Sequence, residues 1–180
     1  NGTPVLVHEV TNGLVYLNLY FDVSDLTLEE LSAATFLMEL LGKLPTAKHS
    51  SAQLQMLTKQ KIGKLNFDEN AYDGKKLSVQ LNAHMVCLAN QKENAADLLC
   101  QILTETRFDD ITLLKNLLNQ TMMNQQMVFV GAGHRFASIR ASAMATGAGA
   151  AQEALYGSTF IQWVKAQCAA DDAALQALAA

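Results

Sequence analysis

From Leu77 to Leu88, apolar and polar side chains alternate without interruption. The apolar series is Leu77, Val79, Leu81, Ala83, Met85 and Cys87, and the polar series is Ser78, Gln80, Asn82 and His84. Alternate side chains of a β-strand project to opposite faces of a sheet, so the pattern predicts a strand with one face on a core. Sheets that are covered on one face only are typical of antiparallel arrangements. The chain is therefore restricted to folds that contain a half-covered antiparallel sheet.

Two further stretches alternate in the same way. One follows Asn12-Gly13, a pair that favours a turn because both residues tolerate positive φ. It places Val15, Leu17, Leu19, Phe21 and Val23 on one face and Tyr16, Asn18, Tyr20 and Asp22 on the other. Tyr16 and Tyr20 either pack across strands or line a binding surface, and packing is favoured. The other stretch runs from Ile62 to Glu69, and Asn70 to Lys76 is expected to be a polar loop.

Helical signals lie between and after these strands. Thr27 and Glu30 form a capping-box pattern. Leu31, Ala34, Met38 and Leu41 then recur at helical spacing, which predicts one apolar stripe, before Gly42 and Pro45 end the helix. A second helix is expected from Ser50 or Ser51 to about Lys59, and a third from Asn90–Glu93 onward with Ala96 and Leu99 inward. A fourth is expected from Ile111 to about Val130. The last two are expected over Phe136–Tyr156, with a kink near Gly147 and Gly149, and from Ser158 onward.

The chain has 180 residues, within the about 100–200 residues of one domain, and half of them are apolar. We predict an α+β fold in which a mostly antiparallel sheet is covered on one face by helices. An N-terminal arm is expected over residues 1–10 and the domain itself over residues 11–168. Residues 169–180 are expected to form a helical or frayed tail or a linker. The small residues Ala137, Ala141, Ala145 and Ala148 predict a close helix–helix contact.

The net charge of -4 argues against a nucleic-acid partner, which usually requires a basic surface. No apolar run approaches the about 20 residues that cross a bilayer, so no membrane partner is expected. The first residues lack the basic region and apolar core of a secretion signal. We therefore expect a cytoplasmic protein of a bacterium, with an organelle as the alternative location.

Residues suited to catalysis are sparse. Cys87, Cys100 and Cys168 are far apart and odd in number, which fits inert thiols better than disulfides or a catalytic thiol. The histidines His8, His49, His84 and His134 form neither of the zinc-peptidase patterns H-x-x-E-H and H-E-x-x-H. His8-Glu9 lacks a second histidine at the required spacing, and His84 is expected to be solvated. We therefore assign no catalytic, cofactor-binding or metal-binding residue to this chain.

Two features have competing interpretations. The segment Gly131-Ala132-Gly133-His134 could cradle a phosphate, with Arg135 and Arg140 nearby, but it follows a helix and lacks the P-loop lysine. A tight helix–helix corner with solvated or ion-paired arginines is favoured. Met122, Met123 and Met127 are typical of a core, and a peptide-binding surface is the alternative.

Several motifs occur together in a defined order. They are Thr11-Asn12-Gly13-Leu14-Val15-Tyr16 leading to Tyr20-Phe21-Asp22, Leu28-Glu29-Glu30-Leu31, Leu41 through Thr46 before Ser50–Leu54, and Gly133-His134-Arg135-Phe136-Ala137 before Arg140. In this order, from about Glu9 to Ala166, the chain resembles the peptidase-associated region of the presequence-protease branch of the pitrilysin/insulysin superfamily of zinc metallopeptidases. It departs from that family at Pro45, where glycine is usual, and at Gly63-Lys64, where a Gly-Gly pair is usual.

The resemblance implies a non-catalytic domain of a zinc metalloendopeptidase that degrades unstructured peptides. In such enzymes two hinged halves enclose a chamber, the zinc is bound by the first half, and the second half forms the opposite wall. The implied partners are other domains of the same polypeptide and unstructured peptides, with zinc in the catalytic half only. The alternative is an inactive structural or assembly module of the same superfamily. A separate enzyme using Cys100 or the His134 corner is the least favoured interpretation.

Overall fold

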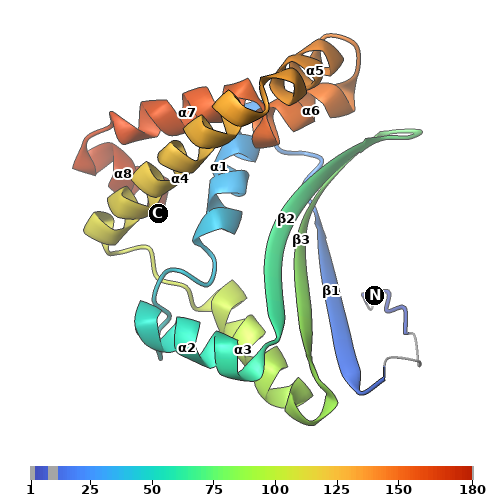
Figure 1. The fold of residues 1–180 in the computed structure, drawn as a ribbon, viewed down its shortest axis with the longest axis vertical. Helices are drawn as coiled ribbons and strands as arrows, with labels where there is room; N and C mark the ends of the chain where they lie inside the picture. Colours follow the sequence, from blue (N-terminus) through green and yellow to red (C-terminus); the bar gives the residue numbers. More distant parts are fainter. Residues whose placement is uncertain (1–2, 8–11, 180) are drawn as a thin grey trace.

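The computed structural model describes residues 3–7 and 12–179. It confirms the predicted α+β fold, because an antiparallel sheet of three strands is covered by helices on one face (Figure 1). The strands are β1 (Leu14–Asp22), β2 (Lys64–Asp73) and β3 (Leu77–Leu88), and their order in the sheet is β1-β3-β2. β3, the strand with the longest alternation, is therefore central, and β1 and β2 are edge strands among the described residues.

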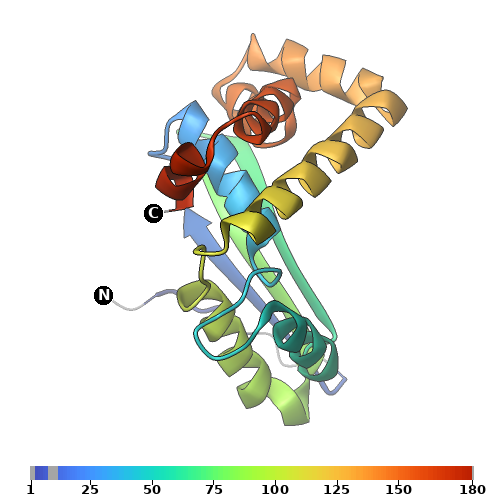
Figure 2. The same cartoon turned by 90° about the vertical axis from the view of Figure 1, so that its left-hand side faces the viewer.

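The helices form two groups on the covered side of the sheet. α2 and α3 lie at one end of the strands, α4 to α8 lie at the other end, and α1 lies between the groups (Figure 1). Figure 2 shows α4 extending away from the sheet to its corner with α5. The bounds are α1 (Leu28–Leu40), α2 (Ser51–Lys61), a short 3-10 turn η1 (Ala89–Gln91), α3 (Lys92–Thr104), α4 (Ile111–Gly131), α5 (Gly133–Ala143), α6 (Gly147–Tyr156), α7 (Ser158–Cys168) and α8 (Asp172–Ala179).

The inward face of β3 forms the floor of the core, as its alternation predicts. Val79, Ala83, Met85 and Cys87 are all buried there. Leu77 and Phe21, which were also expected inside, are exposed because they lie near one end of the sheet. The predicted capping box at Thr27 is present on α1, and Ser50 caps α2 in a second capping box with Gln53. Gly42 adopts a φ of 78° just after α1, which confirms it as the residue that ends that helix.

Three clusters of buried apolar residues fill the space between sheet and helices, and α1 contributes to all of them. Leu31 packs with β2, β3 and α6, whereas Phe36 and Leu40 pack with α4, α7 and α8. Met38 is packed against the third cluster, which includes residues of β3, α2 and α3. The prediction of a single apolar stripe on α1 is therefore wrong, because the helix is buried from several sides. On α3 the inward residue is Ala95 rather than the predicted Ala96.

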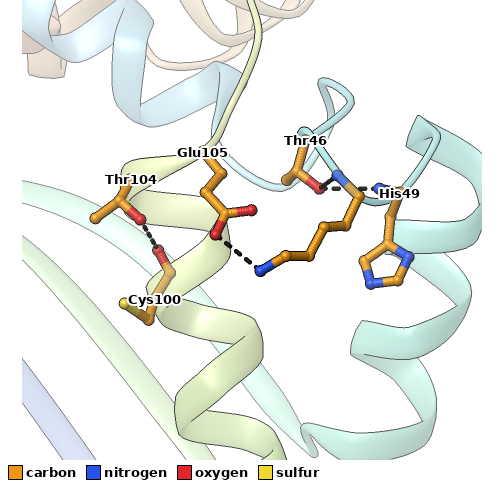
Figure 3. A network of polar contacts seen from close by, with 6 residues as sticks. Thr46, His49, Cys100, Thr104 and Glu105 are labelled. Atoms are coloured by element: carbon orange, nitrogen blue, oxygen red, sulfur yellow. Dashed lines mark hydrogen bonds and ion pairs between the residues drawn. The ribbon is translucent and has the colours of Figure 1, made fainter.

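A short pairing between two loops joins the two groups of helices. Thr46 and Thr106 form an antiparallel β-bridge, flanked by hydrogen bonds from Ala47 N to Glu105 O and from Arg107 N to Pro45 O. The Thr46 hydroxyl accepts hydrogen bonds from the amides of Lys48 and His49, and the Lys48 ammonium lies 3.0 Å from the Glu105 carboxylate (Figure 3). The α1–α2 connection is thereby fastened to the α3–α4 connection.

The predicted loop from Asn70 to Lys76 is wrong in its first half. β2 continues to Asp73, and each residue from Asn70 onward pairs with β3. The polar composition misleads because the side chains of Asn70 and Tyr72 lie on the uncovered face, where a strand tolerates polar residues. The turn is confined to residues 74–76, next to the predicted Asp73-Gly74 signal.

The predicted single helix over Phe136–Tyr156 is two helices, α5 and α6, separated at residues 144–146. Thr146 caps α6 by accepting a hydrogen bond from the Gly149 amide. Ala137, Ala141 and Ala145 are exposed, so the expected small-residue contact does not involve them. The close approach comes instead from Gly149, where an added Cβ would lie 2.3 Å from the Ser142 carbonyl oxygen.

The C-terminal segment forms helix α8, and its Leu175 is buried in the cluster that contains Leu114 and Phe160. Residues 169–180 were expected to be a helical or frayed tail, and the described part is a packed helix. The division of the chain at residue 168 stays a prediction. Of the expected arm, residues 3–7 are described and exposed, whereas His8, Glu9 and Thr11 lie outside the described residues.

We predict that Gly149→Ala lowers the free energy of unfolding by about 1–3 kcal/mol, because the new methyl group would overlap backbone atoms of Ser142 and Ala143. Gly147→Ala is the matched control, since its Cβ would meet only ordinary contacts at 3.8 and 3.9 Å. Urea denaturation followed by circular dichroism measures both variants. Equal midpoints for the two variants would contradict the close α5–α6 contact.

Candidate functional site

The uncovered face of the sheet has a polar surface made of residues from all three strands. We call it the open face and define it by Tyr16, Asn18 and Tyr20 of β1, Asp68 and Tyr72 of β2, and Asn82 and His84 of β3. In Figure 1 the described helices all lie on the opposite side of the sheet. The side chains of the open face can therefore bond to one another, to water or to a molecule that approaches this face.

A chain of polar contacts crosses the open face from one edge strand to the other. Nδ1 of His84 lies 2.6 Å from Oδ1 of Asn18, and Nε2 lies 3.2 Å from Oδ2 of Asp68. The register places Asn18 directly opposite His84, whereas Asp68 lies opposite Asn82 and therefore diagonally across from His84. His84, predicted to be merely solvated, is instead partly buried and bound on both sides, which holds the three strands in register.

Asn82 lies next to His84 on the same face and is only 3% exposed. Its Nδ2 donates to Oδ1 of Asp68 at 2.8 Å, whereas its Oδ1 is buried without a partner among the described residues. Asp68 thus uses one oxygen for Asn82 and the other for His84. A buried acceptor without a donor costs free energy unless water or a ligand satisfies it.

The tyrosines of the open face are exposed rather than packed away. Tyr16, Tyr20 and Tyr72 are 58%, 61% and 54% exposed. Tyr20 also meets the His84 ring edge to face, with 6.0 Å between ring centroids. More than half of the surface of Tyr16 and of Tyr20 is therefore not packed against a neighbouring strand, contrary to the favoured interpretation. Exposed tyrosines around a polar centre are suited to contact a peptide, because each supplies apolar area and a hydroxyl group.

A second acidic group lies at the edge of β2 on the covered side. Burial, together with the nearby carboxylates of Glu39 and Asp68, raises the pKa of Glu69 to about 7. Burial and the Glu69 charge also raise the pKa of Tyr156 on α6, which the Arg135 cation opposes. Glu69 and its neighbours were not identified from the sequence, because Glu39 on α1 lies thirty positions away and only folding brings them together.

The glycine corner at Gly131 is a helix–helix corner, as predicted, with Ala132 as the residue between α4 and α5. Its arginines pair within the chain. The Arg135 guanidinium lies 5.7 Å from the centre of the Tyr156 ring, and Arg140 lies 3.5 Å from the carboxylate of Glu153. Glu153 is buried and accepts hydrogen bonds at the start of α7 from the Ser158 hydroxyl and the Thr159 amide. These contacts support the interpretation of the segment as a structural corner whose arginines pair within the chain.

The thiols and methionines are dispersed. Cys87 is buried and Cys168 is partly buried, and burial raises the pKa of both thiols, whereas Cys100 is exposed on α3. Met122 is packed against the core, but Met123 and Met127 are exposed on α4.

Within residues 3–7 and 12–179, no three His, Cys, Asp or Glu side chains are grouped so that they could hold a metal ion. None of the helices in this part of the chain is long and apolar enough to span a bilayer.

We predict that Glu69→Gln reduces the dependence of stability on pH. The folded-state pKa of Glu69, about 7, is above its unfolded value, so the free energy of unfolding falls as pH rises from about 4.5 to about 7. The amide cannot ionise, so above pH 7 the variant should be more stable than the wild type by about 1–2 kcal/mol, allowing for partial exposure. Urea denaturation from pH 4.5 to 8 measures this difference. Glu93→Gln, at an exposed position of α3, is the control, and parallel curves for wild type and Glu69→Gln would contradict the prediction.

Comparison with known proteins finds similar sequences among proteases. The chain is 26% identical over 161 residues to "Presequence protease, mitochondrial" of Drosophila melanogaster, an alignment that covers 86% of this chain and 15% of the relative. It is 24% identical over 168 residues to "Presequence protease 1, chloroplastic/mitochondrial" of Arabidopsis thaliana, covering 91% of this chain and 16% of the relative. "Protein HypA" of Clostridium perfringens is 20% identical over 169 residues, covering 91% and 17%.

The chain thus spans about a sixth of the length of these relatives. The model of one protein family, described as associated with the peptidases of metallopeptidase family sixteen, subfamily C, matches residues 1–166, which is most of the chain. The resemblance inferred from the motifs is thereby confirmed at the level of the family. This chain belongs to the peptidase-associated family of metallopeptidase family sixteen, subfamily C.

Proposed function

We propose that this chain is a non-catalytic domain of a zinc metalloendopeptidase that degrades unstructured peptides, and that it forms the chamber wall opposite the zinc-bearing half. The observation that supports this most directly is the open face, a polar surface with exposed tyrosines, in a chain of this peptidase-associated family. A wall that contacts many different peptides needs adaptable polar and aromatic groups rather than one deep, specific pocket.

The described residues do not fit a zinc site of their own. They contain no grouping of three potential ligands, and a catalytic zinc usually needs three protein ligands and one open position. We therefore assign zinc binding and peptide hydrolysis to another part of a longer polypeptide. The role of this chain is to position and confine the peptide.

We propose that other domains of the same polypeptide contact the end of α4. Met123, Met127 and Val130 there are exposed, as is Met144 after α5. An apolar surface of this kind commonly marks a contact with another protein surface. We propose no contact with nucleic acid or with a membrane, and either a bacterial cytoplasm or an organelle as the location.

The second candidate is an inactive assembly module within a larger complex. The same apolar end of α4 favours it, because the contact could be made with a separate subunit. The complete reading frame discriminates between the two candidates. An H-x-x-E-H motif upstream of this chain supports the peptidase, and its absence supports the assembly module.

We predict that this chain alone does not hydrolyse a quenched fluorogenic peptide when zinc is added, because the described residues do not assemble a zinc site. The complete protein should hydrolyse the same peptide and lose the activity with 1,10-phenanthroline. Chelator-sensitive turnover by this chain alone would contradict the non-catalytic role.

We predict that a photo-crosslinking residue at Tyr20 of the complete protein attaches to a biotinylated unstructured peptide when hydrolysis is blocked by chelator. The matched control is Met56 on α2, which is 53% exposed against 61% for Tyr20 but lies on the helical side. Detection is by streptavidin blot. Equal labelling from both positions, or labelling from Met56 only, would refute the open face as the peptide-facing wall.

A further inference from the structure

The edge of β2 is open over part of its length. Val23 N donates to Val79 O, so the odd-numbered residues of β3 bond to β1 and the even-numbered ones bond to β2. The backbone groups of Leu65, Phe67 and Glu69 therefore point away from β3. At the far end, Ala71 O accepts a hydrogen bond from Nε2 of Gln152 at 3.2 Å, which closes the edge there. From residue 65 to residue 69, no described residue outside the sheet bonds to this edge.

A groove lies along this open stretch. It has a volume of about 360 Å³ and is lined by all five residues from Leu65 to Glu69 and, across from them, by residues of α1 and the loop that follows it. Met38, Leu65 and Phe67 make part of its wall apolar. This volume is within the about 300–1,000 Å³ that is usual for ligand sites. A strand edge facing such a groove is the geometry in which an extended peptide adds to a sheet.

The charged groups around the groove are unbalanced. Three carboxylates line it, from Glu39, Asp68 and Glu69, against one ammonium group, from Lys43. Lys43 pairs with Glu39 at 3.0 Å, but both side chains are half exposed, and such pairs contribute little stability. The side chain of Glu69 is turned to the covered side of the sheet, towards Glu39, and its raised pKa has its cause in burial and in these neighbours.

Thr35 adds an observation that is independent of the carboxylates. It lines the same groove, it is only 5% exposed, and its hydroxyl oxygen is buried without a hydrogen-bond partner among the described residues. Thr35 and Glu39 are four positions apart on α1, so they lie one above the other on the same face of the helix. A donor group placed between Glu39 and Glu69 would therefore also come near an unsatisfied acceptor.

We infer that this groove binds an extended, positively charged peptide segment, which adds to the free edge of β2 as a further strand and places a lysine or arginine side chain between Glu39 and Glu69. Alternate side chains of the added strand point to the covered side, beside those of Leu65, Phe67 and Glu69. The apolar wall contacts the neighbouring side chains of the peptide, and the carboxylates bind its cation. This inference deepens the proposed function and rests on it for the class of ligand.

The test uses the complete protein with its hydrolysis blocked by chelator. The probe is a fluorescein-labelled peptide of alternating threonine and valine with one central arginine, and fluorescence anisotropy gives its Kd. One matched peptide has glutamine in place of arginine, and another is N-methylated at alternate amides, which prevents strand addition. We expect the arginine peptide to bind about tenfold more tightly than the glutamine peptide and the N-methylated peptide to bind more weakly still.

Glu39→Gln and Glu69→Gln should each remove the preference for arginine, whereas Glu93→Gln should leave it unchanged. Hydrogen exchange at the amides of Leu65, Phe67 and Glu69 should slow when the arginine peptide is added. Binding that is indifferent to both carboxylate variants and to N-methylation would overturn the groove as the site. Protection of these amides before any peptide is added would also overturn it, because another segment would already hold the edge.

The two proposals fail in different ways. If Tyr20 crosslinks to peptide but the groove variants have no effect, the chamber wall stands and the groove is wrong. If the arginine peptide binds as expected but Tyr20 does not crosslink, the open face is wrong and the groove stands as a binding site. If neither Tyr20 nor the groove responds to peptide, both proposals are wrong.

Discussion

Helix α1 is apolar around most of its circumference, and this property determines how the other elements are arranged. A helix of this kind has to be covered from several sides. Leu31 is buried against α6 and the sheet, Phe36 against α4 and α7, and Met38 is packed against the cluster that includes α2 and α3. The only buried polar side chains on α1 are Ser32 and Thr35. Ser32 donates a hydrogen bond to Ala154 O at 2.8 Å, so α1 and α6 are also joined by a polar contact.

Because the helices are gathered around α1, they all lie on one side of the sheet, and the other side is left to its own side chains. His84 is bound by Asn18 and Asp68, and Asp68 in turn is bound by Asn82. Among the described residues, the same arrangement leaves β2 at an edge of the sheet, and α6 bonds to it only near its end, at Ala71 and Asp73. The open face and the groove are thus two results of one constraint, and Asp68 takes part in both.

The sheet could be predicted from the sequence because its signal is local. Alternation in Leu77 to Leu88 and in Leu14 to Val23 is a property of the strand itself, and one covered face preserves it. The capping box at Thr27 and the corner at Gly131 were predictable for the same reason. Contacts between distant segments were not. The partners of His84, the surroundings of Glu69 and the close approach at Gly149 each depend on which elements meet. The end of β2 was predicted to be a loop because polar residues of a strand on an uncovered face have the same composition as a loop.

The bridge between Thr46 and Thr106 has a consequence for how the chain acquires its structure. The intervening segment contains α2, the β2–β3 hairpin and α3, and it begins and ends at the same point. The segment is thus a closed loop, and bringing its two ends together costs on the order of a few kcal/mol in loop-closure entropy. The β2–β3 hairpin and the packing of α2 and α3 lower this cost, because they bring the two ends of the segment closer together. Because β3 also pairs with β1 along the whole length of β1, this segment should not open separately from β1, and the two should unfold as one cooperative unit.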